Sequence, residues 1–205
     1  MIIIPARLSS SRLPKKVLAD INGLPMIIRC ANIAKEVDEV LIATDSKEVI
    51  EVCKKYKFNA VMTNKNHQSG SDRIKEAADI IGLKDNDIVI NMQGDEPFLE
   101  PEILEAVKNE LLSLNRDFKM VSCYKEINEL EAEDPNLVKV VIDKHSNALY
   151  FSRSKIPYNR DNLPHIYKGH IGIYGFDKKS LDIFVSLKGE LEPVSYTHLT
   201  LPTKA

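Results

Sequence analysis

The sequence predicts an α/β protein built on a mostly parallel sheet, with antiparallel strands added in its second half. In the first 112 residues, short apolar runs typical of buried strands alternate with segments whose apolar residues recur at helical spacing. This alternation indicates parallel strands joined by right-handed crossovers. From about residue 120 the strand-like segments follow one another more directly, which indicates antiparallel neighbours and a lobe beside the sheet.

The first half contains four predicted strands, each followed by a helix. The apolar run at residues 2–4 ends at Pro5 and is typical of a short, buried parallel strand. The other strands are predicted over residues 40–43, 60–62 and 87–92. Helices are predicted over residues 26–37, from a D-x-x-E pattern at Asp45, from an S-x-x-D pattern at Ser69, and over residues 101–112. Residues 5–25 are predicted to be a long loop, and long ordered loops are usually functional.

The second half contains the predicted antiparallel part. Strands are predicted over residues 120–124, 138–142, 148–152 and 170–176. Residues 143–147 (DKHSN) are predicted to form a hairpin turn between two of these strands. A final helix is predicted over residues 178–187.

Composition indicates an ordinary globular chain. The 205 residues are 43% hydrophobic and 28% charged, with a net charge of −2. A nucleic-acid-binding protein usually has a strong basic excess, so no nucleic-acid partner is expected. No C-x-x-C pair occurs among the three cysteines, Cys30, Cys53 and Cys123, which argues against a disulfide framework or a zinc site. Free cysteines favour a reduced, cytoplasmic location. No apolar stretch approaches the roughly 18 residues of a membrane helix, so we expect a soluble protein without a membrane partner.

Ligands of parallel sheets bind beyond the carboxyl ends of the strands, and three chemically unusual segments lie there. The first, residues 5–16, carries Arg7, Arg12, Lys15 and Lys16 among serines. Cations and backbone amides at this position can hold a triphosphate, although a basic loop can also be a solvated surface.

The other two segments are residues 63–73 and 93–98. Asp95, in the string MQGDEP, would lie at the sheet edge, where a carboxylate suits Mg²⁺; an ordinary solvated turn is the alternative. In HQSGSDR, Gln68 can pair with a base edge and Ser69 can bind polar groups at a helix start. Ser69 can equally be a simple helix cap, and the two readings are compatible.

Two later segments are weaker candidates. Arg153 and Lys155 follow a predicted strand and could hold an anionic substrate, or could be a basic strand end. His170 lies in a strand pattern, where a structural histidine is more common than a catalytic one.

Six strings in one order resemble the 3-deoxy-manno-octulosonate (Kdo) cytidylyltransferase family. They are PARLSSSRLPKKVL, HQSGSDR, NMQGDEP, VKVVIDKHSNALYFSR, IPYNRD and HIGIYG, and the resemblance covers residues 1 to about 187. It implies a nucleotide-diphospho-sugar transferase-like three-layer α/β sandwich. It also implies transfer of CMP from CTP to Kdo, giving CMP-Kdo and pyrophosphate for lipopolysaccharide biosynthesis, by a cytoplasmic homodimer that uses Mg²⁺.

The resemblance also implies roles for individual residues. The residues that match the CTP-binding positions are Arg7, Ser10, Arg12 and Lys16 for the phosphates and Gln68, Ser69 and Arg73 along the cytidine. The residues that match the sugar pocket are Gln93, Arg153, His170 and Tyr174. Asp95 matches a metal-binding aspartate, and Lys16 and Asp95 are the expected catalytic residues.

The chain departs from the family pattern at two places. Lys15 stands where the family usually has glycine. Residues 194–205 (VSYTHLTLPTKA) resemble a translated sequencing adapter, so we expect a single cytidylyltransferase domain at 1–193, incomplete at its C-terminal end, and a non-native tail at 194–205. The family's late metal-binding aspartate would then be missing, and we expect this chain to be inactive. A cytidylyltransferase for another acid sugar, such as 8-amino-Kdo or a sialic acid, and an inactive nucleotide-binding fragment are the alternatives.

Overall fold

A mixed sheet forms the middle layer of the computed structural model, which describes residues 1–8, 13–67, 69–161 and 163–187. Its strands lie in the order β5-β4-β1-β6-β10-β8-β9, and β7 pairs with β10 outside this path. The parallel half contains β1 (Ile2–Ala6), β4 (Val40–Thr44), β5 (Asn59–Met62) and β6 (Ile88–Asn91). β1 pairs in parallel with both β4 and β6, so the carboxyl ends of all four strands meet at one edge.

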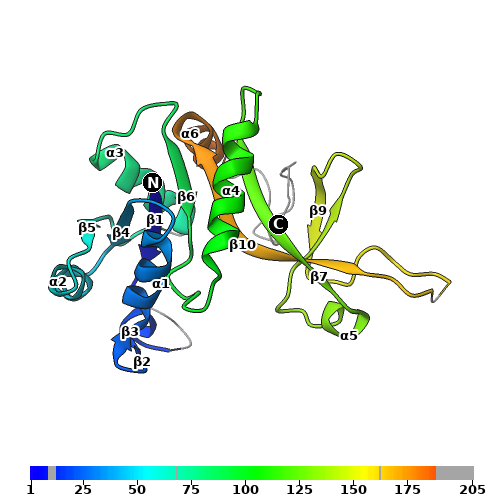
Figure 1. Cartoon of the computed structure of the whole chain (residues 1–205), viewed down its shortest axis with the longest axis horizontal. Helices are drawn as coiled ribbons and strands as arrows, with labels where there is room; N and C mark the ends of the chain where they lie inside the picture. The colour runs from blue at the N-terminus through cyan, green and yellow to red at the C-terminus, as the bar shows by residue number, and fades with distance from the viewer. Residues whose placement is uncertain (9–12, 68, 162, 188–205) are drawn as a thin grey trace.

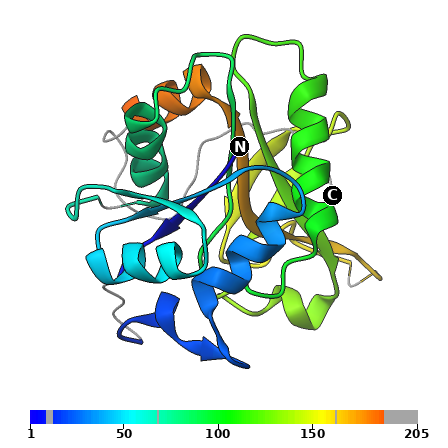
Figure 2. The ribbon, with the colours of Figure 1, turned by 60° about the vertical axis from the view of Figure 1, so that its left-hand side comes forward.

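Helices cover both faces of the sheet. α1 (Met26–Lys35), α2 (Lys47–Lys55) and α4 (Pro101–Ser113) pack on one face, and α3 (Gly70–Ile80) and α6 (Lys178–Ser186) on the other (Figures 1 and 2). Side chains of β1 alternate between the two cores, because successive residues of a strand point to opposite faces. Ile2 and Ile4 join the core under α1, α2 and α4, while Ile3 joins the core under α3 and α6. The predicted three-layer α/β architecture is therefore confirmed.

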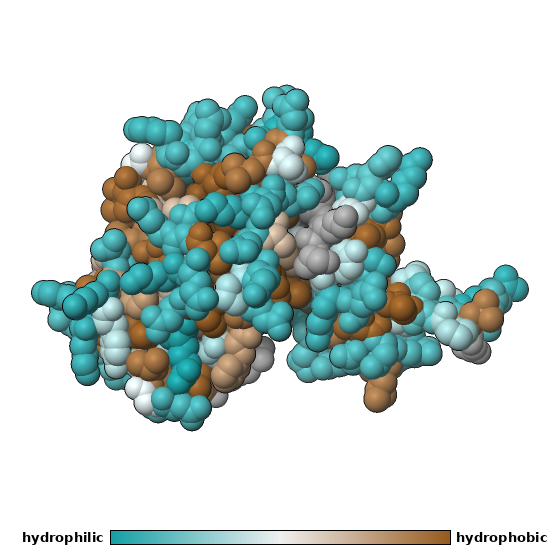
Figure 3. All heavy atoms as spheres, in the orientation of Figure 1, coloured by the Kyte–Doolittle hydropathy of each residue, from teal (hydrophilic) through white to brown (hydrophobic). Residues whose placement is uncertain are grey.

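The antiparallel strands extend the sheet into a smaller lobe. β10 (Tyr167–Asp177) is antiparallel to β6 at its C-terminal end and reaches the lobe at its N-terminal end. There it meets β7 (Met120–Ile127), β8 (Lys139–Ile142) and, through β8, β9 (Ala148–Ser152). A notch separates the lobe from the main body in the space-filling view (Figure 3). The predicted turn between β8 and β9 is confirmed, and Asp143 Oδ1 accepts hydrogen bonds from the amides of His145 and Asn147.

The predicted loop over residues 5–25 contains regular structure. The 3₁₀ helix η1 (Lys16–Leu18) precedes a small hairpin of β2 (Asp20–Ile21) and β3 (Leu24–Pro25). Asn22 and Gly23 turn this hairpin with φ angles of 50° and 83°. An Asn-Gly pair is a strong hairpin signal, which the prediction of a plain loop overlooked.

One helix prediction needs correction, and one short helix was not predicted. α2 does not begin with Asp45: Ser46 is its N-cap and accepts from the Val49 amide at 3.4 Å. The carboxylate of Asp45 instead has partners outside the helix. The short helix α5 (Glu129–Ala132) was not predicted, although Asn128 and Glu131 form a capping box there. The predicted start of α3 after Ser69 is confirmed.

Within the described residues, no helix is both long and apolar enough to cross a membrane. The predicted domain limit at residue 193 and the predicted tail at 194–205 lie outside the described residues, and both stay predictions.

Candidate active site

The first basic segment begins at the carboxyl end of β1. The Leu8 amide donates a hydrogen bond to Asp45 Oδ1 at 3.2 Å, which ties the start of this segment to the end of β4. At the end of the segment, Lys15 adopts a left-handed φ of 56° and η1 begins at Lys16. Of the residues expected to bind phosphate, Arg7 and Lys16 are described, while Ser10 and Arg12 lie outside the described residues.

Lys16 reaches across the sheet edge to the third segment. Its Nζ lies 2.7 Å from Asp95 Oδ2, and the two side chains are 38% and 45% exposed. Gly94 brings this segment close to β1, since a Cβ at Gly94 would lie 3.0 Å from the Pro5 carbonyl oxygen. The structure therefore juxtaposes the two residues expected to be catalytic.

The neighbouring carboxyl groups of Asp95 and Glu96 have different surroundings. Burial, together with the nearby charge of Asp95, raises the pKa of Glu96. The Asp95 side chain is 45% exposed and lies beside the Lys16 ammonium group. Asp95 is consequently the better candidate for contact with a divalent cation.

The second segment forms the start of α3. The Ser69 side chain accepts from the Asp72 amide, and the Asp72 side chain accepts from the Ser69 amide, both at 3.2 Å. This capping box confirms that Ser69 caps the helix, and the position at a helix start also suits polar ligand atoms. Gly70 packs close to Pro5 and Gln93, which joins this segment to the other two. Gln68 lies outside the described residues.

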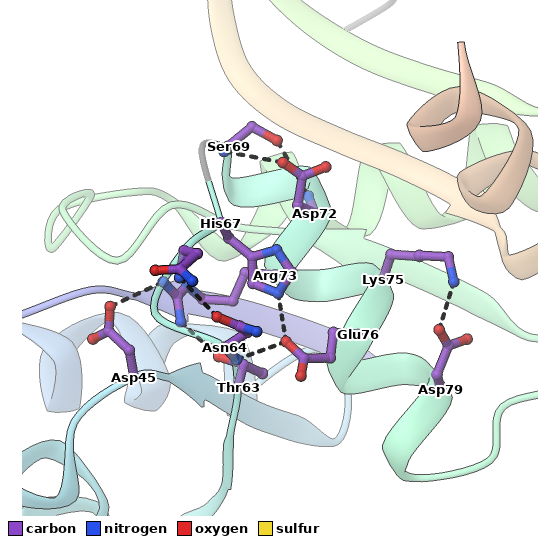
Figure 4. A network of polar contacts seen from close by, with 11 residues as sticks. Asp45, Thr63, Asn64, His67, Ser69, Asp72, Arg73, Lys75, Glu76 and Asp79 are labelled. Carbon is purple, nitrogen blue, oxygen red and sulfur yellow. Dashed lines mark hydrogen bonds and ion pairs between the residues drawn. The ribbon is translucent and has the colours of Figure 1, made fainter. Parts of the chain in front are cut away.

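Arg73 lies on the same helix, and its side chain is buried in the protein. It is 3% exposed, and its guanidinium donates to Thr63 Oγ1 at 2.6 Å and to Asp45 Oδ2 at 3.0 Å (Figure 4). Both of these partners belong to the protein, and Arg73 is not among the residues that line the cavity described below. The geometry therefore does not favour the direct contact with cytidine that the resemblance implies for Arg73.

A cavity of about 1190 Å³ lies between the sheet edge and the lobe. Six of the expected site residues line it: Ser69, Gln93, Asp95, Arg153, His170 and Tyr174. They come from the second and third segments, from the end of β9 and from β10. Arg7 instead lines a second, more open hollow with Lys15 and Asp45.

A bulge in β10 shapes the lobe side of the cavity. Ile171 faces Cys123 of β7, but Tyr174 faces Ser122, so two extra residues are inserted in β10. Such irregularities re-aim side chains and are common near active sites. His170 and Tyr174 flank the insertion, and their ring centroids lie 5.5 Å apart.

His170 is held as a neutral imidazole. Burial lowers its pKa to about 4. The Ser122 hydroxyl donates to the Ile173 carbonyl at 2.8 Å and also lies 2.9 Å from His170 Nε2. This arrangement favours a hydrogen on Nε2 and leaves Nδ1 as an acceptor.

Arg153 lines the cavity and is held in place by the backbone. Its Nη1 donates to the Pro135 carbonyl at 2.9 Å. The buried Lys139 donates to the backbone carbonyls of Arg153 and Asp134, at 2.5 and 2.9 Å. Lys155, the other candidate cation, pairs with Glu129 and Glu133 instead.

Sequence reasoning missed three supporting residues: Asp45, Ser122 and Lys139. Lys139 could have been found from its place in the string VKVV, because a lysine in a buried strand needs polar partners nearby. Asp45 also followed a predicted strand at the ligand-binding edge, but its D-x-x-E pattern was interpreted as a helix start. No sequence pattern pointed to Ser122.

The parallel sheet, the basic segment beside a carboxylate and the adjoining cavity define an α/β nucleotidyltransferase. The chain belongs to the cytidylyltransferase family, whose model matches residues 1–195.

Among curated relatives, the chain is similar to 3-deoxy-manno-octulosonate cytidylyltransferases. It is 48% identical to that of Wolinella succinogenes, over 91% of this chain and 79% of the relative. It is 50% identical to that of Nitratiruptor sp., with the same coverage, and 52% identical to that of Helicobacter pylori, over 88% and 74%. The expected family is therefore confirmed.

The chain is also similar to solved structures of cytidylyltransferases. A CMP:2-keto-3-deoxy-manno-octonic acid synthetase complexed with CTP superposes with a TM-score of 0.86 at 37% identity, over 93% of this chain and 78% of that one. A cytidylyltransferase from Leptospira borgpetersenii, at 17% identity and a TM-score of 0.59, shares the fold.

Proposed function

We propose that this protein transfers CMP from CTP to 3-deoxy-manno-octulosonate, giving CMP-Kdo and pyrophosphate. The pairing of Lys16 with Asp95 beside the cavity carries this proposal, because the cation that would bind phosphate lies next to the carboxylate that would bind a metal ion. Relatives about 50% identical bear the name of this activity.

The nucleotide would lie along the carboxyl edge of the sheet. Lys16 and Arg7 would neutralise the triphosphate, with Ser10 and Arg12 completing that side. The start of α3 at Ser69 would contact the cytidine side, together with Gln68.

The exposed carboxylate of Asp95 fits a Mg²⁺ ion. Among the described residues there is no cluster of three or more histidine, cysteine or acidic side chains suited to a metal. Mg²⁺ commonly binds through one or two carboxylates plus substrate phosphates, and Asp95, which lines the cavity, would supply such a carboxylate. When bound, Mg²⁺ would offset phosphate charge and lower the pKa of the attacking hydroxyl.

The acid sugar would occupy the lobe side of the cavity. Arg153 offers a cation for its carboxylate, and neutral His170 with Tyr174 and Gln93 offers hydrogen bonds to its hydroxyls. The 2-hydroxyl oxygen forms a bond to the α-phosphorus of CTP, and the bond from that phosphorus to the pyrophosphate oxygen breaks. The hydroxyl proton leaves to water, and Lys16 stabilises the departing pyrophosphate by its charge.

The family resemblance further supports a homodimer in the cytoplasm, where CTP is available. Size-exclusion chromatography with light scattering tests the assembly. A mass near twice 23.2 kDa is expected, and a monomer at micromolar concentration contradicts the dimer.

Calorimetric titration with CTP and Mg²⁺ tests the nucleotide site, and a pyrophosphate-release assay with CTP and Kdo tests the reaction. We expect CTP to bind more tightly than UTP or ATP, and failure to bind CTP overturns the proposal. Pyrophosphate release with Kdo supports the proposed reaction and contradicts the inactivity expected from the last twelve residues. Pyrophosphate release only with 8-amino-Kdo or a sialic acid would show that this other sugar, and not Kdo, is the substrate.

A further inference from the structure

We propose that Asp45 is a positioning residue that ties the phosphate side of the nucleotide site to the cytidine side. This inference rests on the proposed function, which places CTP across both sides. It assigns Asp45 and Arg73 to the alignment of the site rather than to contact with the ligand.

The two carboxylate oxygens of Asp45 bind two different segments. Oδ1 accepts from the Leu8 amide at 3.2 Å, at the start of the phosphate-binding segment. Oδ2 accepts from Arg73 Nη2 at 3.0 Å, on the helix that begins at the cytidine side. One side chain at the end of β4 therefore holds both segments.

Burial makes this link stiff. The side chains of Asp45 and Arg73 are 10% and 3% exposed, so the ion pair is largely removed from solvent. Removing one member of such a pair leaves an uncompensated charge, and the remaining partner must move or recruit water. A displaced Arg73 would also lose the Thr63 hydroxyl at 2.6 Å.

Arg73 and the helix start at Ser69 belong to the same helix, so a shift of Arg73 would also move the start of α3 that faces the proposed ligand. Arg73 lies about one turn after the N-cap Ser69, in the same continuous helix, whose first turn is closed by a capping box. Farther along the helix, Glu76 accepts from the Asn64 amide at 2.8 Å and pairs with His67 (Figure 4). These contacts fix the β5–α3 connection, and Asp45 joins α3 to Leu8 through Arg73.

Binding of CTP and of its two halves distinguishes a tie from a general structural role. CTP would contact both segments, whereas pyrophosphate and CMP would each contact mainly one. We expect Asp45→Asn and Arg73→Gln each to weaken CTP binding about tenfold, with CMP and pyrophosphate affinities changing less than about twofold. The double variant should lose little more than either single variant, because both changes break the same link.

Asp79→Asn is the matched control. Asp79 lies on the same helix and pairs with Lys75 at 2.6 Å and Lys178 at 2.7 Å, away from the site. We expect this variant to bind all three ligands as the unaltered protein does. Equal weakening of all three ligands by Asp45→Asn, or unchanged CTP binding, overturns the inference.

Hydrogen exchange tests the Asp45 link between Leu8 and Arg73 even if the proposed function is wrong. If the unaltered protein does not bind CTP, the proposed function falls, but the link can still be measured without ligand. Asp45→Ala should speed exchange of the Leu8 amide several-fold, and Asp79→Asn should not. An unchanged exchange rate of the Leu8 amide in Asp45→Ala would show that Asp45 does not hold this segment.

Discussion

Lys16 Nζ and Asp95 Oδ2 lie 2.7 Å apart although 79 residues separate them in the chain. The contact exists because β1 and β6 are adjacent parallel strands, so the segments that follow them emerge side by side. Both side chains remain substantially exposed, and such a pair contributes little to stability. Its cation and anion are therefore available to contact the proposed nucleotide and Mg²⁺.

Lys16→Met should raise the Kd for CTP at least about tenfold, since a charge-assisted contact to phosphate is lost. Isothermal titration calorimetry measures the effect. Lys15→Met is the matched control, because the adjacent Lys15 is engaged by Glu48 at 2.7 Å. Equal losses in the two variants would show that only the general positive charge of the segment matters.

Asp95→Asn should abolish the tightening of CTP binding by Mg²⁺ while leaving metal-free binding at least as strong. The second effect follows because Lys16 loses its protein partner and is free for phosphate. CTP titrations with and without Mg²⁺ test both effects, with Glu96→Gln as the neighbouring control. A normal Mg²⁺ effect in Asp95→Asn removes this residue from the metal site.

His170 should make the protein less stable in mild acid. Its pKa is about 4 in the folded protein and about 6.5 when unfolded, so the unfolded chain binds more protons between these values. The contribution to the free energy of unfolding is complete above pH 6.5 and is lost as the pH falls toward 4, by at most about 3 kcal/mol. Urea unfolding from pH 7.5 to 4.5 measures the slope. His170→Gln should flatten it, and an unchanged slope assigns the effect to other groups.

Gly94→Ala should destabilise the protein by about 1–3 kcal/mol, because the new Cβ would press on the Pro5 carbonyl oxygen 3.0 Å away. Thermal unfolding measures the loss. Gly172→Ala is the control, since among the described residues its Cβ would meet only the Gln93 side chain, at 3.9 Å. Similar melting temperatures for the two variants would contradict the tight approach of the two segments.

The three cysteines should be unreactive in the folded protein. Burial raises the pKa of Cys30 and Cys123 to about 12 and that of Cys53 to about 11, so the reactive thiolate is scarce at neutral pH. A thiol reagent such as 5,5′-dithiobis(2-nitrobenzoic acid) should titrate three thiols after unfolding and almost none before. Rapid reaction of one thiol in the native protein would place it at an open surface.

Local patterns predicted most of the helices and strands, because the helices bury one face and the central parallel strands bury both faces. The capping box at Ser69 and the turn at Asp143 depend on side chains that are close in sequence, and both predictions are confirmed. The predicted helix start at Asp45 was wrong because its D-x-x-E pattern is also local, whereas its actual partners, Leu8 and Arg73, are distant.

The sequence by itself determined the α/β alternation, the three segments at the ligand-binding edge and the resemblance that the comparisons confirm. These properties depend on periodicity and on residue types at short spacing. The tertiary structure decided which charges meet: Lys16 with Asp95, and Arg73 with Asp45 instead of with the cavity. It also decided that His170 is neutral, because desolvation depends on every segment packed around the imidazole and on no single local pattern.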